Sequence, residues 1–326
     1  MARRRPLGRK LFRSILPILV VVLFSVVIAI AWLVYGVTRP LRQPYLVTPQ
    51  GFQQISGPVL VVTDETWSNR DSTKARGWLL RGTEGAPAIV LLHRYGADRS
   101  WVFNLAVKLH ETTNFTILCL DLRGHGVNPL VQWTSFGSRE GDDVLAALDY
   151  LRGLKAPGGR TLVGDRMGLY GIELGGCAAL RAALRDTRVR ALALDSVPGS
   201  PDELLLAAVK STRGIDNRAS QTLARIGIRA YFLGRYDNTS SCQLAAPLSS
   251  QRVLLLSGED AGYLRNSTTS LGRCFPAPAN VEVKTDLPLT GYQQPSATGE
   301  QGEGYDRLVI EFFDRTLRAG PAQTAP

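Results

Sequence analysis

A run of 23 residues without a charged side chain, close to the N-terminus, constrains this chain more than any other feature. From Ile15 to Val37 the sequence reads ILPILVVVLFSVVIAIAWLVYGV. As an α-helix rising about 1.5 Å per residue, this run extends about 35 Å, which exceeds the ~30 Å hydrocarbon core of a bilayer. A cleaved signal peptide is the alternative, but its apolar region is typically only about 7–15 residues long. We therefore expect an uncleaved transmembrane anchor over residues 15–37.

The distribution of charge predicts the orientation of this anchor. Residues 1–42 contain eight basic side chains and no acidic one, so they account for eight of the net charge of +10. Six of the eight precede the apolar run, and the positive-inside bias then keeps residues 1–14 in the cytoplasm and exports the rest. The expected location is the cell membrane, with one span and an extracytoplasmic main domain. The rest of the chain carries only +2, which argues against a nucleic-acid-binding face.

The four cysteines add little to this assignment. Cys119 and Cys177 lie in apolar runs and are expected to be buried. Cys242 and Cys274 flank a strand near residue 253 and could form a disulfide in an oxidising compartment. Nowhere do the cysteines and histidines have the spacing of zinc ligands. We expect neither a metal nor a cofactor.

After the anchor, short apolar runs alternate with helical periods. One predicted helix covers Asp142–Leu154 and another carries Leu308, Val309, Phe312 and Phe313 on one face. The predicted strands are the runs Pro58–Val62, Ala88–Leu92, Thr116–Leu120, Gly168–Tyr170, Ala191–Leu194, Val253–Leu256 and Val281–Val283. Such alternation is typical of an α/β domain with a mostly parallel sheet flanked by helices.

The domain organisation follows from these patterns. We expect a linker over residues 38–57, an α/β domain over 58–318 and a flexible tail over 319–326. Residues 201–250 interrupt the alternation with two helix-like stretches, Glu203–Lys210 and Ser220–Leu233, and no strong strand. A small helical cap inserted after a strand would have this pattern.

Three segments together resemble the α/β-hydrolase fold superfamily, in its serine esterase and peptidase branch. They are IVLLHRYG at 89–96, LDLRGHG at 120–126 and LYGIELGG at 169–176, the last of which is similar to the nucleophile elbow G-x-S-x-G. An acidic segment, SGED at 257–260, follows a later strand. The resemblance implies the α/β-hydrolase fold over about residues 58–318, here attached to a membrane anchor.

The chain departs from this family at the catalytic positions. Glu173 stands at the elbow where the resemblance implies serine, and Tyr292 stands where it implies histidine. Asp260 is the candidate for the acid position. The three histidines, at 93, 110 and 125, all precede the elbow, whereas the family order is serine, acid, histidine. A Ser-His-Asp triad in that order is therefore impossible, and the triad is degenerate.

The resemblance also assigns Arg94, Tyr95 and Leu174 to the oxyanion-loop positions. Arg94 replaces the glycine that usually follows the loop histidine. Our hypothesis is that Arg94 and Glu173 form a buried pair, which would keep the carboxylate charged. The alternative is that Arg94 reaches solvent and Glu173 is protonated.

The remaining candidate side chains have either a catalytic or a structural interpretation. His93 is either a general base for an ester formed on Glu173 or, as is usual in the family, a structural loop residue. Tyr292 is a poor base because of its pKa of ~10, and its hydroxyl is expected to bond to Asp260 or Glu173. Asp260 either anchors that network or caps its loop. In this fold Asp121, Arg123 and His125 usually tie their turn together.

The leading interpretation is therefore a membrane-anchored pseudo-hydrolase that binds a ligand or partner. One alternative is an active hydrolase of ester- or amide-type bonds with an unconventional Glu173 centre, and another is a structural envelope protein. The expected partners are the membrane and either a small-molecule ligand or an envelope protein.

Overall fold

The computed structural model describes residues 7–56, 60–293 and 300–318. The described chain divides into two compact units. The first combines residues 1–38 with 205–236, and the second combines 39–204 with 237–326. Each unit is described by itself. The predicted tail at 319–326 and the first residues of the predicted strand at 58–62 lie outside the described residues.

The second unit is built on one eight-stranded sheet in the order β1-β2-β4-β3-β5-β6-β7-β8. The pairs β1/β2 and β2/β4 are antiparallel, and every pair from β4/β3 to β7/β8 is parallel. The strands are β1 Val62–Ser68, β2 Lys74–Leu80, β3 Ala86–Leu92, β4 Thr116–Leu120, β5 Val163–Ile172, β6 Val189–Asp195, β7 Arg252–Gly258 and β8 Val281–Leu287.

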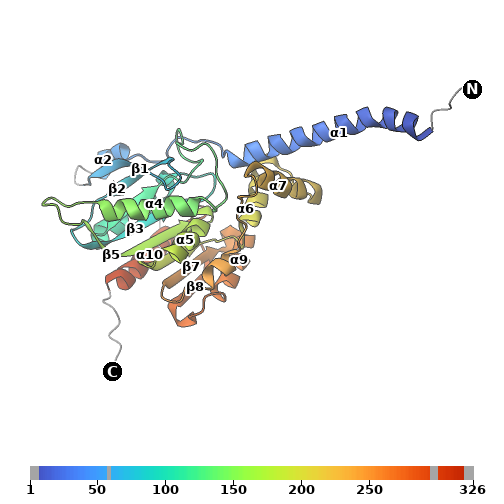
Figure 1. The fold of residues 1–326 in the computed structure, drawn as a ribbon. Helices are drawn as coiled ribbons and strands as arrows, with labels where there is room; N and C mark the ends of the chain where they lie inside the picture. Colours follow the sequence, from blue (N-terminus) through green and yellow to red (C-terminus); the bar gives the residue numbers. More distant parts are fainter. Residues whose placement is uncertain (1–6, 57–59, 294–299, 319–326) are drawn as a thin grey trace, which may run out of the picture. The chain divides into compact units, whose positions relative to one another are not determined.

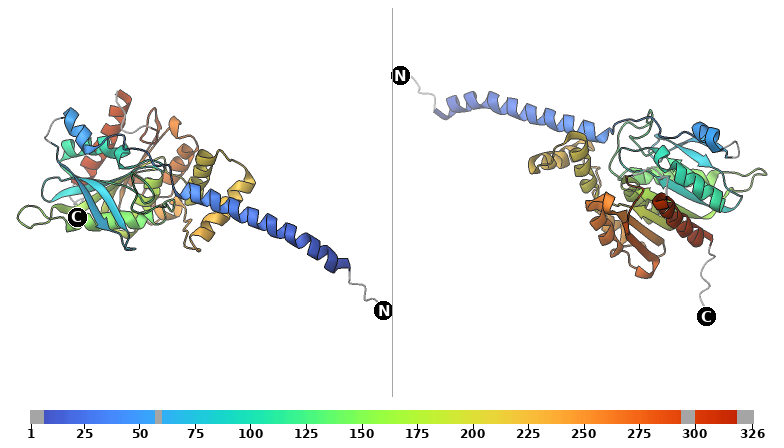
Figure 2. Two further views of the ribbon diagram at one scale, coloured as in Figure 1. Left: turned by 90° about the horizontal axis from the view of Figure 1, so that it is seen from above. Right: turned by 180° about the vertical axis from the view of Figure 1, so that it is seen from behind.

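Helices cover both faces of this sheet (Figure 1). The α4 and α5 helices pack together on one face, whereas α3 and α10 pack together on the other, as the view from behind in Figure 2 also shows. The helices of this unit are α2 Pro49–Ser56, α3 Phe103–Thr113, α4 Glu140–Gly153, α5 Leu174–Arg185, α8 Ser241–Ala245, α9 Tyr263–Gly272 and α10 Glu300–Arg318, with 3-10 turns at Arg99–Val102, Glu259–Ala261 and Pro278–Asn280.

The sheet holds the core because its central strands are continuous apolar runs. Every residue of β4 is buried, as is the stretch Ala88–Leu92 of β3, which is the pattern of strands covered on both faces. Gly168 of β5 allows α10 to approach closely, since a Cβ there would lie 2.7 Å from a ring carbon of Phe313. Phe313 itself is fully buried.

The predicted strands and helices are largely confirmed, with two corrections at the N-terminal edge. The strand expected over Pro58–Val62 begins only at Val62. The antiparallel strand β2 was not predicted, because Arg76 and Gly77 interrupt its apolar residues. Cys242 and Cys274, for which a disulfide was left open, do form one, and Cys119 and Cys177 are buried as expected.

The first unit consists of α1 (Leu7–Thr38), the part of α6 (Pro201–Arg213) from Leu205 onward, and α7 (Arg218–Tyr231). Both helix-like stretches of the expected cap are therefore helical, although the second helix ends at Tyr231. Within this unit α7 packs against α1. The segment Ser14–Thr38 is the one helix of the described residues that is long and apolar enough to span a membrane.

Candidate active-site region

The candidate site residues lie at the carboxyl ends of the parallel strands. Glu173 directly follows β5, His93 follows β3, Asp260 follows β7 and Tyr292 lies in the loop after β8. Because parallel strands end at the same edge of a sheet, ligands of open α/β sheets bind there. Glu173, Asp260 and Arg94 all act electrostatically on the Tyr292 hydroxyl, so the structure brings these predicted residues together.

The turn at Glu173 has the strained backbone of a nucleophile elbow. Glu173 has φ 50° and ψ −102°, in a region that a side chain other than glycine rarely adopts. A Cβ on Gly171 would lie 2.4 Å from the carbonyl oxygen of Gly175, and one on Gly175 would lie 2.5 Å from that of Leu92. The two glycines are therefore required for strand β5 to turn directly into α5, as the sequence predicted.

The Glu173 carboxylate is bound by the backbone donors expected at an oxyanion hole. The Tyr95 N–H donates to Oε2 of Glu173 over 2.9 Å, and the Leu174 N–H also stabilises the carboxylate. In this fold those two positions hold the oxyanion of an acyl-transfer intermediate. The side chain at the elbow therefore occupies the hole itself.

Burial controls the protonation of Glu173. The residue is 5% exposed, and burial raises the pKa of its carboxyl to about 7, against the opposing effects of the Tyr95 N–H, Arg94 and the Leu174 N–H. A carboxyl group with such a pKa changes its charge near neutral pH.

Arg94 does not form the expected pair with Glu173. Its guanidinium carbon lies 4.4 Å from the ring centroid of Trp101 and 5.6 Å from that of Tyr292, while Nη1 donates to the Tyr95 carbonyl over 3.2 Å. Among the described residues no carboxylate forms an ion pair with Arg94, and its buried Nε has no hydrogen-bond partner. The hypothesis of a bidentate pair was wrong because the aromatic rings hold the guanidinium instead.

His93 is engaged at both ring nitrogens. Nδ1 bonds to the Arg94 carbonyl over 2.8 Å, and Nε2 accepts the Leu122 N–H over 3.1 Å. The residue is fully buried, and burial lowers the pKa of its imidazole to about 4. These contacts support the structural interpretation of His93 and leave it no free nitrogen for general-base catalysis.

Asp260 is held by a neighbour other than Tyr292. The Thr290 hydroxyl donates to Oδ2 of Asp260 over 2.9 Å. Within the described ranges the Tyr292 hydroxyl forms no hydrogen bond to Asp260 or to Glu173, so that expectation was wrong. Burial raises the pKa of Tyr292 to about 12, which keeps the hydroxyl protonated at neutral pH.

The turn after β4 has the structural role that the resemblance implied. Asp121 accepts the Arg99 N–H over 3.0 Å and Nε of Arg76 over 3.1 Å. The Arg123 guanidinium bonds to both carboxylate oxygens of Asp143. Nδ1 of His125 donates to the Arg123 carbonyl over 2.9 Å, and burial lowers the pKa of this imidazole to about 3.

A buried hydrogen-bond network next to the site was missed by the sequence reasoning. Asp195, the last residue of β6, accepts the Tyr305 hydroxyl over 2.7 Å, and the Tyr170 hydroxyl lies 2.7 Å from the same oxygen of Tyr305. Burial raises the pKa of Asp195 to about 7. The only signal in the sequence was an aspartate ending an apolar strand.

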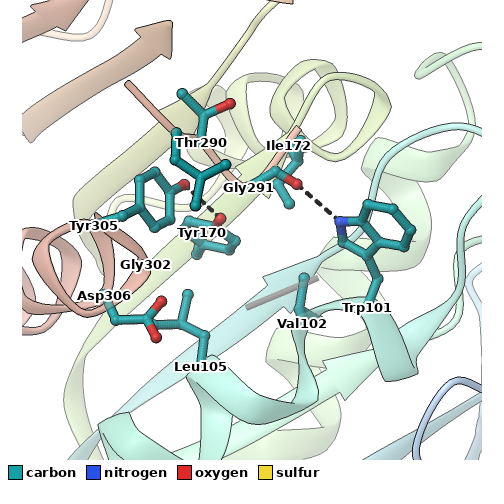
Figure 3. A pocket seen from close by; sticks show the side chains of 11 residues that line it. Trp101, Val102, Leu105, Tyr170, Ile172, Thr290, Gly291, Gly302, Tyr305 and Asp306 are labelled. Carbon is teal, nitrogen blue, oxygen red and sulfur yellow. Dashed lines mark hydrogen bonds between the residues drawn. The ribbon is translucent and has the colours of Figure 1, made fainter. Parts of the chain in front are cut away.

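This network borders a small cavity (Figure 3). Trp101 closes one side, where its Nε1 donates to the Gly291 carbonyl over 2.8 Å. The cavity offers about 10 Å³, which is roughly the space of one water molecule. A cavity of this size is too small for a substrate molecule.

A sheet of this strand order, with a strained elbow after its central strand, defines the class of α/β-hydrolase folds. The family model described as "Alpha/beta hydrolase family" matches residues 89–321, and the chain belongs to this family.

The individual proteins that resemble this chain are only distantly similar to it in sequence. The thiohydrolase aneE of Aspergillus aculeatus is 28% identical over 121 residues, which cover 37% of this chain and 36% of that protein. The match thus spans about a third of this curated relative. The Pyrococcus furiosus esterase Pf2001 superposes with a TM-score of 0.58 at 18% identity, covering 86% of this chain and 99% of the esterase. The α/β hydrolase GrgF from Penicillium sp. sh18 has a TM-score of 0.58 at 17% identity, over 80% of this chain and 100% of GrgF.

Proposed function

We propose that this protein is a membrane-anchored pseudo-hydrolase, an α/β-hydrolase family member without Ser-His-Asp catalysis that binds a ligand. The observation that carries the proposal is the hydrogen bond from the Tyr95 N–H to Glu173 at 2.9 Å. A carboxylate that already occupies the oxyanion donors competes with any acyl oxygen for them.

The contacts of His93 argue against an active Glu173 centre. An ester formed on a carboxylate must be cleaved by water, and that step needs a base within hydrogen-bond reach. Both ring nitrogens of His93 are already bonded. Tyr292 keeps its proton at neutral pH, because burial raises its pKa to about 12.

Arg94 is the group through which we propose that a ligand is held. The guanidinium is half-buried over Trp101 and close to Tyr292, and it has no carboxylate partner among the described residues. A carboxylate is the ligand group that best matches a guanidinium. The proposed ligand class is therefore a small organic carboxylate.

The membrane anchor and its orientation belong to the same proposal. Support comes from the apolar length of Ser14–Thr38 and from the excess of basic residues before it. The Cys242–Cys274 disulfide agrees with a main domain on the oxidising side of the membrane. Resistance of the full chain to alkaline extraction, together with an intact N-terminus, would test the anchor.

The proposed lack of hydrolase activity is tested with the full chain in detergent. Wild type and Glu173→Gln are assayed on aryl esters, aminoacyl amides and, because the curated relative is called a thiohydrolase, acyl thioesters. We expect no turnover above the rate with heat-denatured protein. Turnover by the wild type that Glu173→Gln abolishes would overturn the proposal and establish a carboxylate enzyme.

Ligand binding is tested by thermal shift with a series of short carboxylic acids. A shift is expected for the wild type and not for Arg94→Gln. If no acid shifts the wild type, or if both proteins shift equally, Arg94 is not the ligand site.

A further inference from the structure

The α7 helix is fastened to the end of the apolar helix α1 (Figure 1). A Cβ on Gly227 of α7 would lie 2.5 Å from Cγ2 of Ile30 and 2.6 Å from Cγ2 of Val34. The lack of a side chain at Gly227 therefore lets the two helices approach closely. The Arg213 guanidinium, at the end of α6, lies 3.8 Å from the ring centroid of Trp32 and donates to the Trp32 carbonyl over 3.3 Å.

These contacts fix α7 at a definite level along α1. A hydrocarbon core of about 30 Å is crossed by about 20 helical residues. If the span begins at Ile15, it therefore ends near Val34. The side chains of α1 change character at the same level. Phe24 and Ile28 are exposed by 66% and 53%, whereas Val34 and Val37 are buried. Protein thus covers one face of α1 where the hydrocarbon is expected to end, while Trp32 and Tyr35 on the remaining surface are exposed by 53% and 61%.

At this level α7 and the turn that follows it present apolar side chains outward. Ile226, Tyr231 and Leu233 are exposed by 54%, 40% and 87%. An aliphatic side chain as exposed as Leu233 is unfavourable in water, and several of them together mark an interaction surface.

The same segment carries positive charge only. Between Asp216 and Asp237 the chain has four arginines, at positions 218, 225, 229 and 235, and no acidic residue. Three of them, Arg218, Arg229 and Arg235, are exposed. Basic side chains beside exposed apolar ones match a membrane interface, where the acyl boundary takes the apolar groups and anionic headgroups attract the cations.

We propose that residues 217–235 dock on the surface of an anionic membrane, with Ile226 and Leu233 inserted at the boundary between headgroups and acyl chains. The inference rests on the proposed membrane anchor and goes beyond it. A single helix leaves a domain free to turn above the bilayer, whereas a second, interfacial helix attached to it fixes the orientation of this unit.

The experiment uses the full chain in lipid nanodiscs, with an environment-sensitive fluorophore on a single introduced cysteine. Ile226→Cys and Leu233→Cys report on the proposed docking surface, and Val22→Cys reports on the span. Selective labelling is feasible because Cys119 and Cys177 are buried and the other two cysteines form the disulfide. Quenching is measured with lipids brominated near the headgroup end of the acyl chains for positions 226 and 233, and with lipids brominated deeper along the chains for position 22.

For labels at 226 and 233 we expect at least twofold quenching in nanodiscs with anionic lipid. Replacing Arg218, Arg229 and Arg235 by glutamine should reduce this quenching at least twofold and leave Val22→Cys unchanged. Labels at 226 and 233 that stay unquenched while Val22→Cys is quenched would overturn the inference and keep the anchor, and this face would then be open to a protein partner. A label at position 22 that no brominated lipid quenches would refute the anchor itself.

Discussion

Glu173→Gln offers the sharpest test of the buried carboxyl at the elbow. Glutamine keeps the shape of glutamate and an oxygen that can accept the Tyr95 N–H, but it cannot ionise. Burial raises the pKa of Glu173 from 4.5 to about 7. At about 1.36 kcal/mol per unit, the full penalty for ionising this group in the folded protein is on the order of 3 kcal/mol.

The direction of the pH effect on stability follows from the number of protons that the folded and the unfolded states bind. Below about pH 4 the carboxyl is protonated in both the folded and the unfolded states, so the substitution should change the free energy of unfolding little. Between pH 4.5 and about 7 the folded state retains a proton that the unfolded state has lost, and wild-type stability therefore falls as pH rises. Above about pH 8 Glu173→Gln should be more stable than wild type by about 3 kcal/mol.

The assay is thermal unfolding of the full chain in detergent from pH 4 to pH 9. For a domain of this size about 3 kcal/mol corresponds to a rise in Tm of roughly 6–12 °C at high pH. Glu111→Gln, which changes an exposed glutamate on α3, is the matched control and should follow the wild type. A difference in Tm between Glu173→Gln and wild type that is the same at every pH would refute the reasoning, because it would reflect the amide and not the lost ionisation.

Two further variants test the close packing at the elbow and the contribution of the disulfide to stability. Gly171→Ala should lower the free energy of unfolding by about 3 kcal/mol or prevent folding, because its Cβ would lie 2.4 Å from the Gly175 carbonyl oxygen, whereas Gly153→Ala meets open space and should change stability by less than about 1 kcal/mol. Cys242→Ser combined with Cys274→Ser removes a cross-link over 32 residues and should cost about 3–4 kcal/mol. Thermal unfolding measures both effects, and a reductant should lower the Tm of the wild type and leave the double variant unchanged.

The fold could be predicted because its signals are local and repeated. Buried parallel strands such as Ala88–Leu92 and Thr116–Leu120 are continuous apolar runs, and glycines 171 and 175 mark the elbow. The strand β2 could not be predicted in the same way. It is an antiparallel strand near the sheet edge with Arg76 in its middle, so it lacks the apolar run that identifies a central strand.

The candidate site was predictable in its positions and not in its contacts. Glu173, Asp260 and Tyr292 each follow a parallel strand. Their positions in the sequence therefore predict that they lie at the same edge of the sheet. The partner of Arg94 depends on side-chain packing, which the sequence does not reveal. A nearby carboxylate was the simpler expectation, but the Trp101 ring, contributed by a 3-10 turn that no periodicity predicted, lies 4.4 Å from the guanidinium.

The role of Glu173 follows from the backbone around it. The loop after β3 and the elbow direct the N–H groups of Tyr95 and Leu174 to the same carboxyl group. A buried donor without an acceptor costs about 1–3 kcal/mol. In a serine hydrolase of this fold, water or the substrate oxygen satisfies these donors. Here the carboxylate of Glu173 does so, at 2.9 Å from the Tyr95 nitrogen. Glu173→Ser would therefore not restore an enzyme. It should leave both donors to an incoming water and lower the Tm at pH 4, where the Glu173 carboxyl is protonated in the folded and the unfolded states. It should also remain without turnover, since no histidine follows the elbow in the sequence. A serine variant as stable as wild type at pH 4 would show that Glu173 is not what stabilises these donors.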